Sequence, residues 1–216
     1  MGAPLGILGI LLAGLTGMLC GLFVRRAADR LSGGKPIGGR TLAIEAVVAA
    51  LFIAIFLDRG ASPSGLLLAL LVLGLATLSV VDLKISIIPD NIQLVLAPLG
   101  VVYRTVDGSS VVDDILISLI GGAFAGGVAF AVHYGFKRLR GRDGLGLGDV
   151  KFFAVAGLWL GPFGLPAFMI VSGVTGVVFA LLWRRLGGGR EFPFGPSLAL
   201  GLFICLLFPA LTRIFG

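Results

Sequence analysis

Charged side chains are scarce in this sequence: 13% of its 216 residues are Asp, Glu, Lys or Arg, whereas 57% are hydrophobic. Soluble domains carry about 25% charged residues, so this composition argues against an ordinary soluble enzyme. Only two cysteines, Cys20 and Cys205, and one histidine are present. The chain alone therefore supplies neither a disulfide framework nor a four-cysteine zinc site.

The hydrophobic residues fall in runs long enough to cross a bilayer, which takes roughly 20 residues as a helix. The run 152–183 exceeds one ordinary crossing, and Gly161, Pro162 and Gly164 offer a turn that divides it. We therefore predict an all-α polytopic membrane protein with about eight transmembrane helices. The predicted spans are 4–24, 41–57, 63–81, 87–103, 112–136, 150–161, 164–183 and 194–212.

Basic residues predict the orientation of these spans. In a soluble protein the net charge of +6 would suggest nucleic acid as a partner. Here the basic residues lie mainly in the loops between the predicted spans, so we expect lipid contacts and no nucleic acid. Since Lys and Arg concentrate in cytoplasmic loops, both termini are predicted outside, which leaves only Arg59, Arg104 and Arg213 on the outer side. The inner cations are then Arg25, Arg26, Arg30, Lys35, Arg40, Lys84, Lys137, Arg138, Arg140, Arg142, Lys151, Arg184, Arg185 and Arg190.

The start of the chain is expected to be a retained span. It has no Lys or Arg before Arg25, unlike the basic start of a cleaved signal peptide. Glycine pairs with a spacing of four residues predict tight helix packing in lipid. These pairs are Gly17 and Gly21, Gly122 and Gly126, and Gly157 and Gly161.

Carboxylates are costly in a membrane protein unless they lie at an interface, in a wet cavity or in a pair. Most of the eleven acidic residues have an ordinary structural explanation. Asp29, Asp143 and Glu191 lie among loop arginines, and Asp58, Asp107, Asp113 and Asp114 lie in predicted outer turns. Four candidates remain, and these are Glu45, Asp82, Asp90 and Asp149.

Asp82 and Asp149 are predicted at the cytoplasmic ends of two different helices. Two such carboxylates can approach, share a proton because like charges disfavour double ionisation, and polarise a water between them. One then takes a proton from the attacking water while the other, protonated, donates to the scissile carbonyl. The alternative is that each is an interfacial helix cap or pairs with the nearby Lys84 or Lys151.

A glycine-rich stretch, 144–148, precedes Asp149. A phosphate-binding loop is excluded because no strand surrounds the stretch and no Gly-Lys-Ser/Thr follows. Instead, we expect Gly146 and Gly148 to adopt positive φ and to let another chain, the substrate of a protease, approach Asp149 closely.

Two segments carry a resemblance to a known family. Val81-Asp82-Leu83-Lys84-Ile85-Ser86-Ile87-Ile88-Pro89-Asp90 and Gly146-Leu147-Gly148-Asp149-Val150-Lys151-Phe152-Phe153 resemble the signatures of type IV prepilin peptidases, the GxGD class of membrane aspartic proteases. The resemblance implies that Asp82 and Asp149 are the catalytic pair of a bacterial inner-membrane enzyme. It further implies that the enzyme cuts a short leader from pilin-like precursors (type IV prepilins or pseudopilins) after a glycine, just before their hydrophobic segment, at the cytoplasmic face.

The same resemblance implies a single transmembrane domain over 1–216, in which 1–60 is a shortened counterpart of the family's methyltransferase part and 61–216 is the peptidase part. Many bacterial members have a long first loop with two CxxC pairs and methylate the new N-terminus using S-adenosylmethionine. Residues 25–40 contain no cysteine and are too short for that loop. We therefore expect proteolysis without metal or cofactor and without methylation, although Glu45 and the first-loop glycines could still hold S-adenosylmethionine.

Supporting roles are predicted for three further residues. Lys151 is expected to anchor a helix end, with substrate orientation as the alternative. Asp90 is expected to cap the fourth span, with contact to a basic leader as the alternative. Glu45 suits the dipole at the start of the second span.

His133, Trp159 and Trp183 receive no catalytic role. The histidine is expected to be structural, and the two tryptophans fit interfacial belts.

Two other classes of function stay open from the residues alone. In a transporter or channel subunit, Asp82 and Asp149 would relay protons or bind a cation, which favours carboxylates near the bilayer midplane and repeated halves. A non-catalytic assembly scaffold would need neither aspartate.

Overall fold

The structure is a computed structural model that describes residues 3–33, 41–106, 108, 110–141, 144–185 and 192–214. Seven loop positions discussed above lie outside these residues, namely Lys35, Arg40, Asp107, Arg142, Asp143, Arg190 and Glu191. Within the described ranges the chain is helical and contains no strand, which confirms the predicted all-α class.

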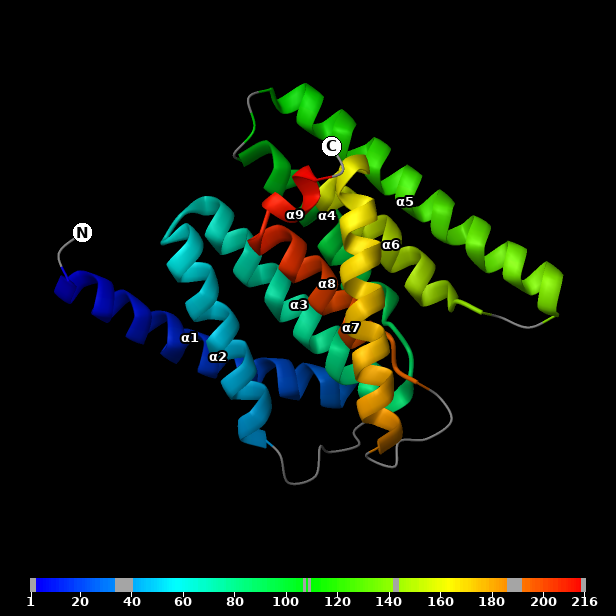
Figure 1. The fold of residues 1–216 in the computed structure, drawn as a ribbon. Helices are drawn as coiled ribbons and strands as arrows, with labels where there is room; N and C mark the ends of the chain where they lie inside the picture. The colour runs from blue at the N-terminus through cyan, green and yellow to red at the C-terminus, as the bar shows by residue number, and fades with distance from the viewer. Residues whose placement is uncertain are drawn as a thin grey trace.

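Eight long helices and two short ones follow one another along the described chain (Figure 1). Their bounds are α1 Ala3–Leu31, α2 Thr41–Arg59, α3 Pro63–Ile85, α4 Asp90–Val106, α5 Val111–Arg140, α6 Leu147–Leu160, the 3-10 helix η1 Pro162–Gly164, α7 Leu165–Arg185, α8 Gly195–Leu207 and α9 Ala210–Arg213.

Each of the eight long helices overlaps one predicted span along the sequence, and α1, α3, α5 and α7 lie in the stretches that are long and apolar enough to cross a membrane. The predicted break after α6 is present, because Gly161 has a φ of 74° and η1 follows it. The last span differs from the prediction, since α8 ends at Leu207 and a separate turn forms α9. Pro209 has no backbone N–H and disfavours helical geometry at Phe208, whose φ and ψ are −119° and 75°.

Four stretches of the described chain are long and apolar enough to cross a membrane: Gly6–Leu31, Pro63–Ile85, Val111–Arg140 and Pro162–Arg185. Large hydrophobic side chains such as Leu15 and Val177 are more than half exposed, as expected for contact with lipid. The protein is therefore a polytopic, all-helical membrane protein.

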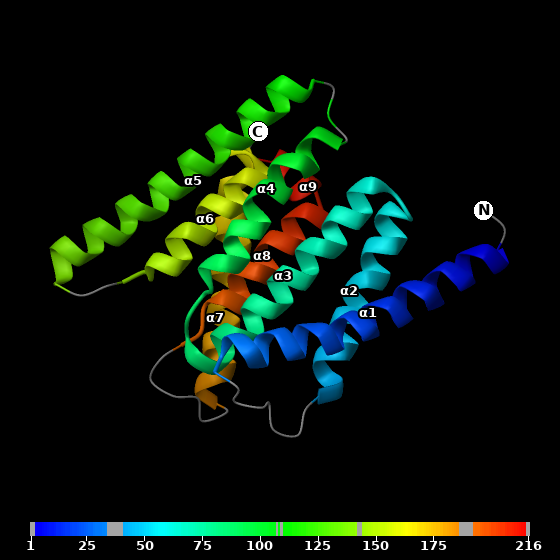
Figure 2. The same ribbon diagram turned by 180° about the vertical axis from the view of Figure 1, so that it is seen from behind.

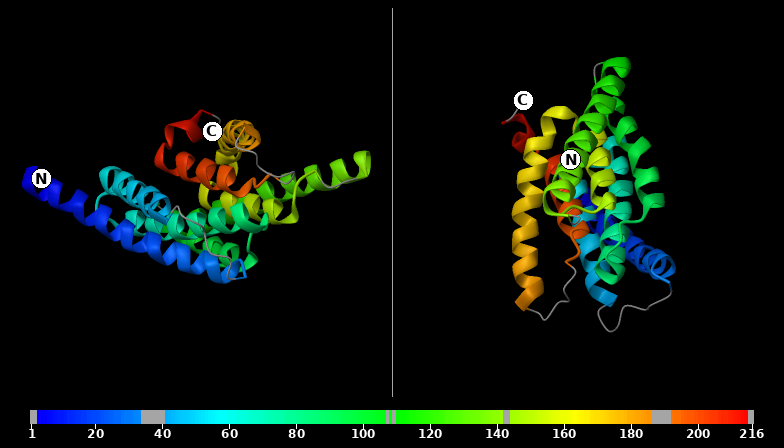
Figure 3. Two further views of the ribbon diagram at one scale, coloured as in Figure 1. Left: turned by 90° about the horizontal axis from the view of Figure 1, so that it is seen from below. Right: turned by 90° about the vertical axis from the view of Figure 1, so that its right-hand side faces the viewer.

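Helices α3 and α8 lie side by side in the middle of the molecule (Figures 1 and 2). Helix α1 packs along α2 on one side, and the long helix α5 packs along α6 on the other, so α1 and α5 extend in opposite directions (Figure 3). The central core includes Leu78, Phe152, Phe168 and Leu202, all fully or almost fully buried. This core holds the C-terminal end of α3 near the N-terminal ends of α6 and α8.

The predicted glycine packing is confirmed at the two peripheral helix pairs. A Cβ added to Gly21 of α1 would lie 2.6 Å from the Cα of Glu45 in α2, and one added to Gly157 of α6 would lie 2.2 Å from the Gly121 carbonyl oxygen in α5. Such backbone contact is possible only without side chains.

The interfacial placement predicted for Trp159 is wrong. The side chain is 1% exposed, and its indole Nε1 donates to the Leu96 carbonyl at 2.9 Å. A buried tryptophan needs such a partner for its N–H, and the Leu96 carbonyl of α4 supplies it. Trp159 therefore joins α6 to α4.

Candidate active site

Asp82 lies in the last turn of α3, immediately before the helix ends. Ser86 adopts left-handed geometry, with a φ of 52°, and its backbone N–H donates to the Asp82 carbonyl at 2.7 Å. This reversal leads residues 87–89 out of the helix and across to α4. The turn thereby places the segment after α3 beside the Asp82 side chain.

The Asp82 carboxylate is held by α8. It is 4% exposed, and its Oδ2 accepts a hydrogen bond from the backbone N–H of Gly195 at 2.7 Å. The alternative partner, Lys84, instead forms an ion pair with Asp29 at the end of α1 and donates to Ser32. Asp82 is therefore positioned by a main-chain amide.

Asp149 is the third residue of α6, and its Oδ2 accepts from the backbone N–H of Gly146 at 3.2 Å. A carboxylate here suits the helix N-terminus. Its alternative partner, Lys151, pairs with Asp90 at 2.6 Å, and both of those side chains are largely exposed. Asp149 is thus also oriented by a backbone donor.

Two other side chains hold the backbone that precedes Asp149. Gln93 of α4 is buried, and its Nε2 donates to the Gly148 carbonyl at 3.3 Å. The His133 Nδ1 lies 2.6 Å from the Leu145 carbonyl oxygen, which agrees with the structural role expected for this residue. The turn before α6 is consequently tied to both α4 and α5.

Both aspartates line one cleft of about 520 Å³ between the C-terminal end of α3 and the N-terminal ends of α6 and α8. The cleft is lined by Asp82, Ser86, Ile87, Ile88, Pro89, Asp90, Gly146, Leu147, Gly148, Asp149, Phe192 and Phe194. Five of the seven predicted site residues are in this set, and Lys151 adjoins it through Asp90.

The remaining predicted residue, Glu45, lies between α1 and α2. Its side chain is buried, and Oε1 is 3.7 Å from Nη1 of Arg25, while Oε2 has no hydrogen-bond partner. The structure does not bring Glu45 to the cleft.

The positive φ expected for two glycines is wrong. Gly146 has a φ of −66° and a ψ of 148°, as the residue before a helix, and Gly148 lies in the first turn of α6. The close approach at Gly148 is made by the protein's own chain, because a Cβ there would lie 3.1 Å from the Ile88 Cβ. The small residue allows the segment after α3 to pack against the start of α6.

Sequence reasoning missed Gly195, Gln93, Phe192 and Phe194. The phenylalanines and Gly195 belong to a segment far from both signature segments, so only the packing of α8 against α3 reveals them. Gln93 had a weak signal, since an amide is unusual in a predicted span.

The arrangement fits general acid–base chemistry on a water. Two carboxylates share a cleft that is open to solvent, and neither is neutralised by a cation among the described contacts. Within the described residues, no group of three His, Cys, Asp or Glu side chains is arranged to hold a metal ion.

Comparison with known proteins finds relatives that carry the same name. The chain is 30% identical to a prepilin leader peptidase/N-methyltransferase of Aeromonas hydrophila over 182 residues, which are 82% of this chain and 62% of that protein. It is 36% identical over 132 residues to the Escherichia coli (strain K12) protein of the same name, covering 60% of this chain and 57% of that one. The chain thus spans roughly half to three-fifths of the length of these relatives. No solved structure matches.

The profile of the type IV leader peptidase family matches residues 69–181, more than half of the chain, and this region contains both signature segments. Together with the paired carboxylates of α3 and α6, this match shows that the chain belongs to the type IV leader peptidase family.

Proposed function

We propose that this protein is a membrane aspartic endopeptidase that removes the leader from type IV pilin-like precursors. The observation that carries the proposal is the placement of Asp82 and Asp149, from two helices, in a single cleft. Each accepts a hydrogen bond from the backbone, so each carboxylate is oriented without being locked into an ion pair.

In the proposed reaction, one aspartate carboxylate accepts a proton from a water molecule bound between the two. The resulting hydroxide attacks the carbonyl carbon of the scissile peptide, while the other, protonated, aspartate donates to the carbonyl oxygen. The proton held by the first carboxyl then passes to the leaving amine as the C–N bond breaks. Two carboxyl groups and one water suffice for this sequence.

The proposal also covers the substrate and the side of the membrane that the cleft faces. The relatives are named prepilin leader peptidases, and the family resemblance implies cleavage after a leader glycine, just before the precursor's hydrophobic segment. We place the cleft on the cytoplasmic side of a bacterial inner membrane, supported by the basic residues at the same helix ends, such as Arg30, Lys84, Lys137 and Arg184.

Residues 61–216 would form the peptidase part and 1–60 the counterpart of the methyltransferase part. The relatives also carry N-methyltransferase in their names. We propose proteolysis without a cofactor and without transfer of a methyl group, because residues 25–40 lack the cysteine-rich loop.

The transporter alternative receives less support. Both carboxylates lie at one end of their helices, in one open cleft, whereas a proton or cation pathway favours sites near the bilayer midplane.

The deciding experiment incubates the detergent-purified protein with a pilin-like precursor and follows leader removal by mass spectrometry. Asp82→Asn and Asp149→Asn should each lower the cleavage rate by about 100-fold to 10,000-fold, because one carboxyl cannot act as both base and acid. Asp113→Asn, at an exposed position in the first turn of α5, is the matched control and should cleave normally. Normal turnover by either cleft variant would rule out the pair.

A further inference from the structure

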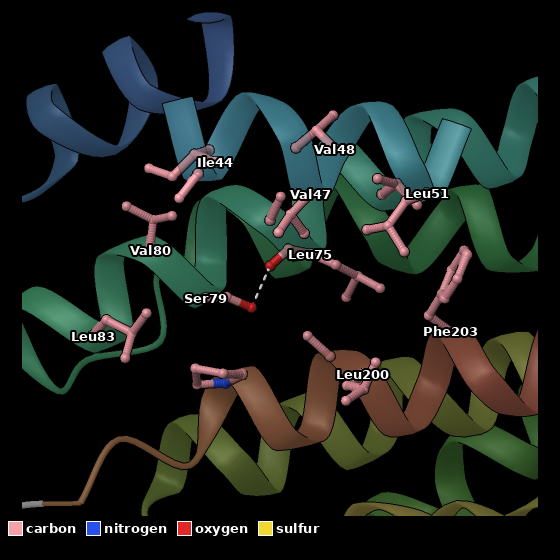
Figure 4. A pocket seen from close by; sticks show the side chains of 15 residues that line it. Ile44, Val47, Val48, Leu51, Leu75, Ser79, Val80, Leu83, Leu200 and Phe203 are labelled. Atoms are coloured by element: carbon pink, nitrogen blue, oxygen red, sulfur yellow. Dashed lines mark hydrogen bonds between the residues drawn. The ribbon is translucent and has the colours of Figure 1, made fainter. Parts of the chain in front are cut away.

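An apolar groove of about 360 Å³ lies between α2, α3 and α8 (Figure 4). Its walls include Val47 and Leu51 of α2, Leu75 of α3, and Leu200 and Phe203 of α8. Among its lining residues Ser79 alone has a polar side chain, and that hydroxyl donates to the Leu75 carbonyl of its own helix at 2.7 Å. The groove therefore offers an apolar surface without a free hydrogen-bonding group.

The inner end of the groove adjoins the aspartate cleft on two walls. Leu83 of α3 lines the groove and follows Asp82, which lines the cleft. On α8, Pro196 lines the groove, and only Gly195, the donor to Asp82, separates it from Phe194 in the cleft. A chain that leaves the cleft past Asp82 would enter the groove directly.

From that end the groove runs along the helices into the membrane. Its contacts on α3 extend back from Leu83 to Val72, a length of about 16 Å at 1.5 Å per residue. The groove also opens sideways, since Val47 is 58% and Leu200 43% exposed. An occupant could thus arrive from the lipid.

We propose that this groove binds the apolar segment that follows the scissile bond of the precursor, as an α-helix. The inference rests on the proposed function, which places the scissile bond between Asp82 and Asp149. A segment in this groove meets no polar partner, so its own N–H and C=O groups must pair with each other, and a helix is the form that achieves this. A lipid chain is the competing occupant.

Filling the groove tests the proposal. Ser79→Phe places a ring in the groove and should raise KM for the full-length precursor about tenfold, with little change in kcat, because hydrophobic pocket contacts discriminate by about this factor. Ala50→Phe, at an exposed position of α2 outside the groove lining, is the matched control and should leave both constants unchanged.

Photocrosslinking detects what occupies the groove, and it requires neither cleavage nor a side chain that fills the groove. A photoreactive phenylalanine at Val47 or Leu200, in a chain that also carries Asp149→Asn, should crosslink to the precursor's apolar segment. The same group at Ala50 should not. Crosslinks to lipid alone, or equal precursor crosslinking from Ala50, together with an unchanged KM in Ser79→Phe, would overturn the proposal. A wild-type protein that cleaves no precursor would count against the proposed function. The crosslinks test separately whether the precursor's apolar segment occupies the groove.

Discussion

Asp82 and Asp149 are both oriented by main-chain amides, from Gly195 and Gly146. Hydrogen bonds to a charged acceptor are stronger than neutral ones, and a backbone donor brings no mobile side chain or net charge. A salt bridge to Lys84 or Lys151 would have kept one carboxylate ionised and occupied. Each of these lysines instead pairs with another acid, which leaves the two cleft carboxylates available to hold and release a proton.

At the residue scale, Gly195→Ala should lower cleavage by roughly tenfold or more. An added Cβ would lie 2.8 Å from Oδ2 of Asp82 and 3.0 Å from its Cγ, so the buried carboxyl would have to move, and small displacements of catalytic groups are costly. Cleavage rates of the purified variant check this prediction.

The matched control for this substitution is Gly173→Ala. That glycine lies in α7, and a Cβ there meets no atom within 4 Å, so the variant should cleave like the wild type. Equal rates for the Gly195 and Gly173 variants would mean that the contact with Asp82 has no role in orienting it.

At the scale of helices, hydropathy and turn residues predicted most of the fold. The eight apolar runs became eight helices, and Gly161 and Pro162 marked the break before α7, because burial in lipid and the geometry of Gly and Pro act locally. The break before Pro209 was missed because the apolar run continues through it.

Contacts between distant segments could not be predicted in the same way. Trp159 has the composition of an interfacial residue, and only its place between α4 and α6 makes it part of the core. The paired aspartates were predicted because the C-terminal end of α3 and the N-terminal end of α6 were both expected on the same side of the membrane. Gly195 was not, since its role depends on how α8 packs against α3.

The link between α4 and α6 is expected to act on catalysis more than on stability. Gln93→Leu removes the donor to the Gly148 carbonyl, but it also removes Oε1, a buried oxygen without a partner. The thermal unfolding midpoint should therefore change little, while kcat/KM should fall roughly tenfold because the start of α6 carries Asp149.

Ser118→Ala provides the comparison for Gln93→Leu. The Ser118 hydroxyl donates to the Leu158 carbonyl at 2.6 Å and so joins α5 to the end of α6 that is opposite Asp149. Loss of this bond should leave kcat/KM near the wild-type value. A similar loss of activity in both variants would indicate general loosening of α6 instead of a local effect on Asp149.

At the scale of the whole molecule, the distribution of Lys and Arg predicts the orientation in the membrane. In a chain with Cys20→Ala and Cys205→Ala, the exposed positions Arg30→Cys and Arg138→Cys should react with an impermeant thiol reagent only from the cytoplasm. Ala61→Cys and Asp113→Cys should react only from outside. Labelling of Arg138→Cys from outside would put the cleft on the wrong face.

The short first loop predicts a simpler activity than that named for the relatives. The purified protein should cleave the precursor at the same rate with and without a metal chelator, and the new N-terminus should remain unmethylated in the presence of S-adenosylmethionine. Mass spectrometry of the product checks both statements. A product heavier by one methyl group, formed only when this protein is present, would contradict the second.

If the precursor occupies the groove as proposed, the sideways opening at Val47 and Leu200 determines which substrate concentration controls the rate. A precursor that reaches the cleft through this opening arrives by diffusion in the plane of the bilayer. Turnover would then follow the number of precursor molecules per lipid instead of their amount per volume. Adding empty lipid to a fused proteoliposome preparation, at constant protein and precursor, would slow cleavage by surface dilution alone.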